Sequence, residues 1–136
     1  MTRVETRRKA PQLPEQIVLA SRAAWDKKAI ELAVLDLRKA AGFTDFFLLC
    51  SGTNTRQTRA IADGVMEALA AQGVKPAHVE GYDRSEWILL DYFDFIVHIF
   101  IPETRMFYGL ERLWGNAERV TLDDDATLGR PVQTGG

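Results

Sequence analysis

The chain has 136 residues, of which 46% are hydrophobic and 26% are charged, and its formal net charge is −2. This composition suits one domain with a packed core and excludes wholesale disorder, and no apolar run reaches the roughly 18 residues of a membrane span. Cys50 is the sole cysteine, which excludes an internal disulfide and, with only two histidines present, argues against structural zinc. The N-terminus lacks a secretory signal pattern, so we expect a reducing cytosol.

A polar, basic lead-in over residues 1–11 precedes a predicted helix that begins near Pro14 and carries apolar residues at helical spacing as far as Trp25. The segment after Trp25 has two interpretations. High helix propensity lets the helix run on through Ala29–Ala41, whereas alternation of apolar residues suits a separate strand over Glu31–Leu37. Local pattern favours the helix, and the strand remains an alternative.

The next segments have clearer patterns. The continuous apolar run from Asp45 to Ser51 predicts a strand that is buried on both faces. Gly52 then turns the chain into a helix that ends at Gly73, with Thr53, Asn54 or Thr55 as its cap. Three short strands are predicted after it, the last two joined by a tight turn: Ala77–Glu80, Glu86–Leu90 and Phe95–Ile101.

Pro102 predicts the start of a last helix that reaches about Ala117, with Phe107, Leu110, Leu113 and Trp114 facing inward. We therefore predict an α/β fold with a mixed five-stranded sheet and about three helices. The predicted domain spans residues 12–120, and residues 121–136 form an acidic, glycine-containing tail.

The predicted strand over Phe95–Ile101 is apolar on both faces. In one interpretation, the helices leave part of one sheet face uncovered, and that face binds a partner. In the other, the helices divide between the two faces and bury both. The sequence pattern leaves both alternatives open.

Charge is distributed unevenly along the chain. Residues 1–39 hold nine Lys or Arg and five acidic residues, whereas residues 40–136 hold eight and fourteen. The stretch Ser85–Glu103 contains four acidic residues and neither Lys nor Arg. Such a surface repels phosphate backbones, so the predicted partner of the second half is a basic protein rather than bare RNA or DNA.

No motif in the sequence predicts an enzyme. The turn Ser51–Arg56 lies before a helix N-terminus and offers a weak anion site, but it has neither a Walker lysine nor a Rossmann glycine pattern. Asp91 and Asp94 are better placed to satisfy turn donors, or to meet cations on a partner, than to share metal ions. Cys50 in an apolar strand is expected to be an inert thiol.

Many separate motifs resemble, in order and spacing, the ribosomal silencing factor family, also called RsfS, YbeB or Iojap. The resemblance covers about Glu31 to Trp114 and rests on Thr44-Asp45, Ser51-Gly52-Thr53, Arg56-Gln57, Ala60-Ile61-Ala62-Asp63, Glu80-Gly81, Trp87, Asp91-Tyr92, Asp94, Val97-His98, Phe100, Glu103, Arg105, Tyr108, Leu110-Glu111 and Leu113-Trp114.

The resemblance implies a nucleotidyltransferase-like fold without catalytic acids, and it favours the strand over Glu31–Leu37. It also implies a cytoplasmic, non-enzymatic factor without a cofactor. Such a factor binds the large ribosomal subunit through ribosomal protein uL-fourteen, blocks subunit joining and represses translation when nutrients are scarce. Neither a membrane nor DNA is an expected partner. A nucleotide-binding enzyme using the Ser51–Arg56 turn and a homodimeric scaffold are the competing hypotheses.

The family motifs predict a set of partner-binding residues. Trp87 is expected to be an apolar anchor, Asp91 and Asp94 to pair with Lys or Arg, and His98 to offer a hydrogen bond. The other predicted members are Tyr92, Phe93, Glu103 and Tyr108. Phe93 departs from the family pattern, which commonly has glycine there, and this puts the turn geometry and the direction of both aspartates in question.

Overall fold

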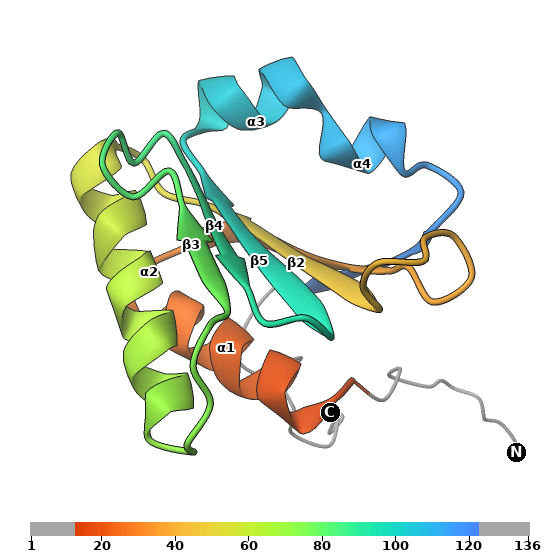
Figure 1. Cartoon of the computed structure of the whole chain (residues 1–136). Coiled ribbons are helices and arrows are strands. Elements are labelled where there is room, and N and C mark those ends of the chain that lie inside the picture. Colours follow the sequence, from red (N-terminus) through yellow and green to blue (C-terminus); the bar gives the residue numbers. More distant parts are fainter. Residues whose placement is uncertain (1–12, 123–136) are drawn as a thin grey trace, which may run out of the picture.

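The structure is a computed structural model and describes residues 13–122, so the predicted lead-in and residues 123–136 lie outside the described part. Its centre is a six-stranded mixed sheet in the order β3-β4-β5-β2-β1-β6, in which β2 and β5 are parallel (Figure 1). The elements are α1 (Glu15–Asp26), β1 (Ile30–Asp36), β2 (Phe46–Ser51), α2 (Thr55–Ala70), β3 (His78–Glu80), β4 (Trp87–Asp91), β5 (Phe95–Phe100), α3 (Pro102–Tyr108), α4 (Leu110–Leu113) and β6 (Glu118–Leu122).

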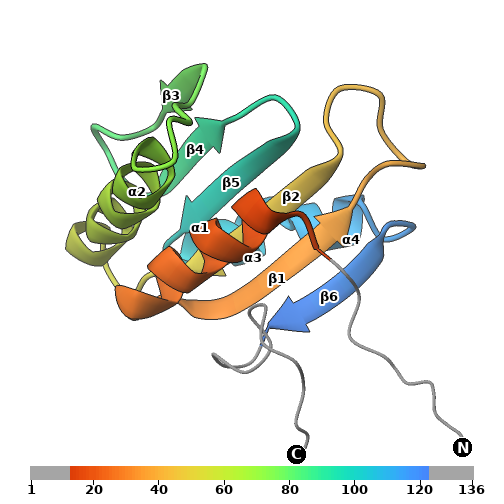
Figure 2. The same cartoon turned by 90° about the horizontal axis from the view of Figure 1, so that it is seen from below.

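The helices divide between the two faces of the sheet. Helices α1 and α2 lie on one face, and α3 and α4 arch over the other (Figures 1 and 2). Every residue of β2 and β5 is buried, because each strand contributes to two separate apolar clusters. Of the two alternatives for the sheet faces, the division of helices is therefore the one that the structure shows. No helix within residues 13–122 has the length and apolar character needed to cross a membrane.

The segment Glu31–Leu37, for which the sequence left a helix and a strand open, is the strand β1 in the structure. Helix α1 ends at Asp26, Lys28 takes a positive φ of 70°, and β1 then pairs antiparallel with β2 on one side and β6 on the other. Gln57 donates its side-chain N–H to the carbonyl oxygens of Lys27 and Lys28, at 3.3 and 3.1 Å, which holds the end of the helix. Sheet pairing thus overrides the helix propensity of these residues.

Helix α2 begins as its sequence predicts. Asn54 is the cap, and its side-chain oxygen accepts the backbone N–H of Gln57 at 2.9 Å. Gly52 allows the strand-to-helix turn to close, since a Cβ at that position would lie 2.9 Å from the backbone nitrogen of Thr58. The helix therefore packs directly after the buried strand β2.

The predicted last helix begins at Pro102 as expected, but its predicted extent to Ala117 was wrong, and so was the predicted count of five strands. The helix breaks at Gly109, which takes a φ of 57°, and Phe107 and Leu113 are 77% and 70% exposed rather than inward. Residues 118–122 form a sixth strand, β6, which reaches two residues beyond the predicted end of the domain. Pairing with β1 supplies the hydrogen bonds that make this short edge segment a strand.

Candidate functional site

Trp87 and His98 form a fixed pair beneath α3. Trp87 begins β4 and His98 lies in β5, and the indole N–H donates to Nδ1 of His98 at 3.0 Å. His98 is only 3% exposed, and burial lowers its pKa to about 3, so the ring is neutral at physiological pH. Because Nδ1 accepts, the ring proton is assigned to Nε2.

Trp87 is also fixed by two aromatic neighbours. Its ring centroid lies 5.1 Å from that of Phe100 in the sheet and 4.8 Å from that of Tyr108 in α3. Tyr108 in turn meets Phe107 edge-on at 5.0 Å. The outer side of Trp87 faces a groove of about 490 Å³, which we call the Trp87 groove; its lining includes Arg84, Glu86, Trp87, Glu103, Phe107 and Tyr108.

Asp91 ends β4, at the opposite end of the strand from Trp87, and Asp94 lies in the turn that leads to β5. Phe93 takes a φ of 70° in this turn, a conformation that favours glycine, and its side chain is 68% exposed. The carboxylate of Asp91 accepts the backbone N–H of Phe93 at 2.8 Å, and Thr44 donates its hydroxyl to the Phe93 carbonyl at 2.7 Å. Asp91 thus stabilises the turn, whereas Asp94 is exposed.

Tyr92 is buried, with 7% of its surface exposed, and stacks on Phe95 at a centroid distance of 4.9 Å. Burial raises the pKa of its hydroxyl to about 12. The structure therefore brings together Trp87, Glu103 and Tyr108 with His98 beneath them, and it places the 91–94 turn at the far end of β4. Direct contact of any of these residues with a partner stays a prediction.

Two backbone donors of the Ser51–Arg56 turn are engaged within the protein. Gly52 donates to the Phe100 carbonyl at 2.9 Å, and Thr53 donates its backbone N–H to the side chain of Gln57 at 2.8 Å. A phosphate-binding loop instead needs such N–H groups to be available. Across residues 13–122 there is no cluster of three or more metal-ligating side chains, and burial raises the pKa of the Cys50 thiol to about 12.

The family model described as ribosomal silencing factor during starvation matches residues 10–134. This chain belongs to the ribosomal silencing factor family. It is 38% identical over 109 residues to ribosomal silencing factor RsfS of Halalkalibacterium halodurans, covering 80% of this chain and 93% of that protein. A crystal structure of a Chromobacterium violaceum protein superposes with a TM-score of 0.72 at 30% identity, covering 84% of this chain and 97% of the other.

A more distant relative in mouse is named mitochondrial assembly of ribosomal large subunit protein 1. It is 30% identical over 91 residues, which cover 65% of this chain and 40% of the mouse protein. Bacterial and organellar proteins thus share this domain.

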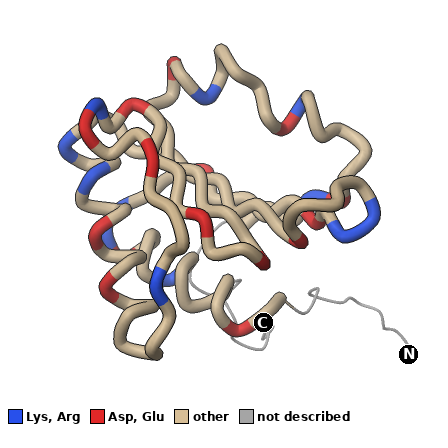
Figure 3. The backbone as a smooth tube through the Cα atoms, in the orientation of Figure 1, with Lys and Arg blue, Asp and Glu red and all other residues tan. Residues whose placement is uncertain are grey.

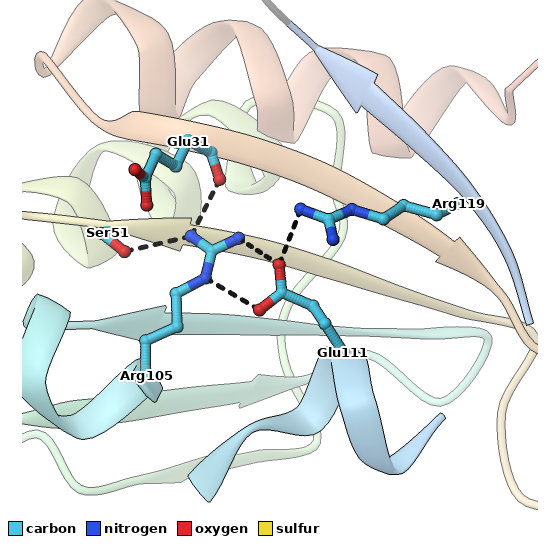
Figure 4. Close-up of polar contacts among 5 residues, drawn as sticks. All are labelled: Glu31, Ser51, Arg105, Glu111 and Arg119. Atoms are coloured by element: carbon cyan, nitrogen blue, oxygen red, sulfur yellow. Dashed lines mark hydrogen bonds and ion pairs between the residues drawn. The ribbon is translucent and has the colours of Figure 1, made fainter. Parts of the chain in front are cut away.

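Arg105 holds α3 in place in this member of the ribosomal silencing factor family (Figure 4). It is 8% exposed and donates to the backbone carbonyl of Glu31 at 2.8 Å, to Ser51 at 3.0 Å and to both carboxylate oxygens of Glu111. Hydrogen bonding to Arg105 is the main reason why the pKa of Glu111 lies below its usual value, and Arg119 from β6 adds a contact at 2.9 Å. These contacts tie the Trp87 groove to the sheet.

Charges and exposed apolar side chains mark two sides of this ribosomal silencing factor fold. The loop between β1 and β2 carries Arg38 and Lys39 and lies beside the turn between β4 and β5, which carries Asp94 (Figure 3). Four apolar side chains of α3 and α4 are exposed: Met106, Phe107, Tyr108 and Leu113. Helical spacing had predicted that two of these, Phe107 and Leu113, face the core. The spacing predicted a buried stripe because the break at Gly109 was not apparent.

Proposed function

We propose that this chain is a ribosome-binding factor that occupies the large ribosomal subunit and blocks its joining to the small subunit. Membership of the ribosomal silencing factor family carries this proposal. The mouse relative, whose name refers to assembly of the large ribosomal subunit, supports the choice of subunit. The proposed mechanism is steric and needs no cofactor or catalytic residue. The protein would act in the cytoplasm and repress translation when nutrients are scarce.

The proposed contact is ribosomal protein uL-fourteen, met by the aromatic and acidic side of the domain. Trp87 and Tyr108 offer half-buried and exposed aromatic surface, and aromatic residues are frequent anchors in protein interfaces. Glu103 is an exposed acid beside these aromatic residues and complements a basic protein surface, whereas Asp94, exposed at the far end of β4, is a separate candidate contact. Phosphate backbone, in contrast, is repelled by this side of the molecule.

Sedimentation with purified ribosomal subunits tests the proposal. The chain is expected to migrate with the large subunit, not with the small one, and increasing amounts are expected to reduce the fraction of joined ribosomes. Folded protein that stays at the top of the gradient in every mixture would refute it. Adding ATP with magnesium to a thermal unfolding assay tests the enzyme hypothesis in parallel, since a nucleotide bound to the native state raises the melting temperature.

A homodimer is compatible with the same proposal when the self-contact uses Met106 and Leu113, the exposed apolar side chains of α3 and α4 that lie outside the Trp87 groove. Light scattering across a range of protein concentrations distinguishes a monomer from a dimer. A mass that stays at that of one chain would exclude self-association.

A further inference from the structure

The walls of the Trp87 groove are fixed before any partner arrives. The indole is oriented by its hydrogen bond to His98, and on the opposite wall Gly81 lies so close to β4 that a Cβ there would meet the Trp87 carbonyl oxygen at 2.0 Å. Ser85 is fully buried, its backbone N–H donates to the Gly81 carbonyl at 2.8 Å, and its hydroxyl donates to the Tyr82 carbonyl at 2.6 Å. A groove ordered in this way loses little conformational entropy on binding.

The lining of the groove combines aromatic and acidic side chains. Trp87, Phe107 and Tyr108 supply aromatic surface, and the carboxylates of Glu86 and Glu103 line the same groove. Among the described residues, Glu103 makes no ion pair. Aromatic faces and carboxylates both attract cations, and together they favour a positively charged group with an apolar stem.

We propose that the Trp87 groove binds a single Lys or Arg side chain of a protein on the large ribosomal subunit. This inference rests on the proposed function and names the chemistry of its contact. The aliphatic stem lies against Trp87 and Tyr108, and the charged end meets the carboxylate of Glu103. An RNA phosphate fits neither feature, because the acidic rim repels it.

Arg84 is the cation already present among the residues that line the groove. Its guanidinium lies 3.6 Å from a carboxylate oxygen of Glu86, although its side chain is 82% exposed. An exposed pair of this kind is weak, so an incoming cation displaces it at little cost. Arg84 adds a positive charge to the lining of the groove, which opposes an incoming cation, and its removal should favour binding.

Charge substitutions measured by affinity for purified large subunits test this inference. Glu103→Gln is expected to weaken binding roughly tenfold, and Arg84→Gln to strengthen it about threefold. Glu67→Gln is the matched control, because Glu67 is an exposed acid on α2, on the other face of the sheet, and should leave affinity within about twofold. The effect of Glu103→Gln should shrink as salt rises from about 0.1 M to about 0.5 M.

A ring substitution separates a cation from an apolar occupant. Tyr108→Leu keeps an apolar side chain but removes the aromatic face, and it is expected to weaken binding about fivefold. Thermal unfolding checks that each variant is folded; Tyr108 is half exposed and Glu103 is exposed, so both changes should be tolerated.

The outcomes distinguish this inference from the proposed function. If the wild-type chain fails to bind large subunits, both are refuted. If it binds and Glu103→Gln matches Glu67→Gln, the proposed function stands and the cation-binding groove is wrong. Tighter binding by Glu103→Gln would place RNA at the groove, and an unchanged affinity for Tyr108→Leu would place an apolar side chain there; either result overturns the inference.

Discussion

Acidification from pH 7 to pH 5 should destabilise this domain through one residue, His98. In the folded chain its imidazole is enclosed by Trp87, Phe47 and Phe100, and burial holds its pKa near 3. In the unfolded chain the same group returns to the ordinary value of about 6.5. Between these two values the unfolded chain binds a proton that the folded chain does not.

The sign and the size of the effect depend on this difference. The stabilising contribution is complete above about pH 6.5 and is lost as the pH falls toward about 3, because protons then favour the unfolded chain. From pH 7 to pH 5 the free energy of unfolding should fall by about 2 kcal/mol, since each pH unit well below the unfolded pKa contributes about 1.4 kcal/mol. Small domains have only about 5–15 kcal/mol in total, so the change is readily measured.

Urea unfolding at both pH values, for the wild type and for His98→Gln, measures the contribution. A glutamine oxygen can accept the Trp87 indole N–H but does not titrate, so the variant should lose about 2 kcal/mol less than the wild type. The lowered carboxylate pKa values of Asp36 and Glu111 act at a lower pH and should affect both proteins alike. Equal losses in the two proteins would show that His98 becomes protonated within the fold, and the reasoning would fail.

Further substitutions test other parts of the structure by urea unfolding or thiol labelling. Trp87→Phe leaves the buried Nδ1 of His98 without a donor and should cost about 1–2 kcal/mol; a smaller loss would mean that water replaces the donor. Arg105→Met leaves Glu111 with Arg119 alone and should cost about 2–3 kcal/mol, and an unchanged stability would show that α3 is held by apolar contacts only. Phe93→Gly should stabilise the domain by about 0.5 kcal/mol, because relief of the positive φ exceeds the extra freedom of the unfolded chain. Cys50 should react with a thiol reagent only as the protein unfolds, and rapid labelling of native protein would contradict its burial.

Elements buried on both sides were predictable from the sequence. The apolar runs of β2 and β5 have a single structural interpretation at their length, and the capping residues Thr53–Thr55 mark the start of α2, where the structure assigns the cap to Asn54. β1 was harder, because its residues favour a helix locally and become a strand only by pairing with β2 and β6. The resemblance to a family, rather than the local pattern, identified it.

The break in the last helix and the strand β6 could not be predicted from local sequence patterns. Gly109 divides the last helix, but a glycine within a helical pattern is compatible with either a continuous or a broken helix. In β6 only Val120 and Leu122 turn toward the core, which is too short an alternation to distinguish a strand from a tail. Arg105 donates to acceptors that lie 54 and 74 residues away in sequence, and local residue spacing does not predict contacts over such separations.

The candidate site shows why matched motifs do not by themselves define a surface. Trp87 and Tyr108 border a groove, whereas His98 lies beneath it and acts on Trp87 through a hydrogen bond. Loss of that acceptor leaves only Phe100 and Tyr108 to orient the indole, so a change at His98 can weaken binding without any contact between His98 and a partner. A motif therefore combines residues that touch the ligand with residues that orient them, because both kinds of loss reduce binding. Burial separates the two kinds here, and it directs mutagenesis of the interface to Glu103 and Tyr108 first.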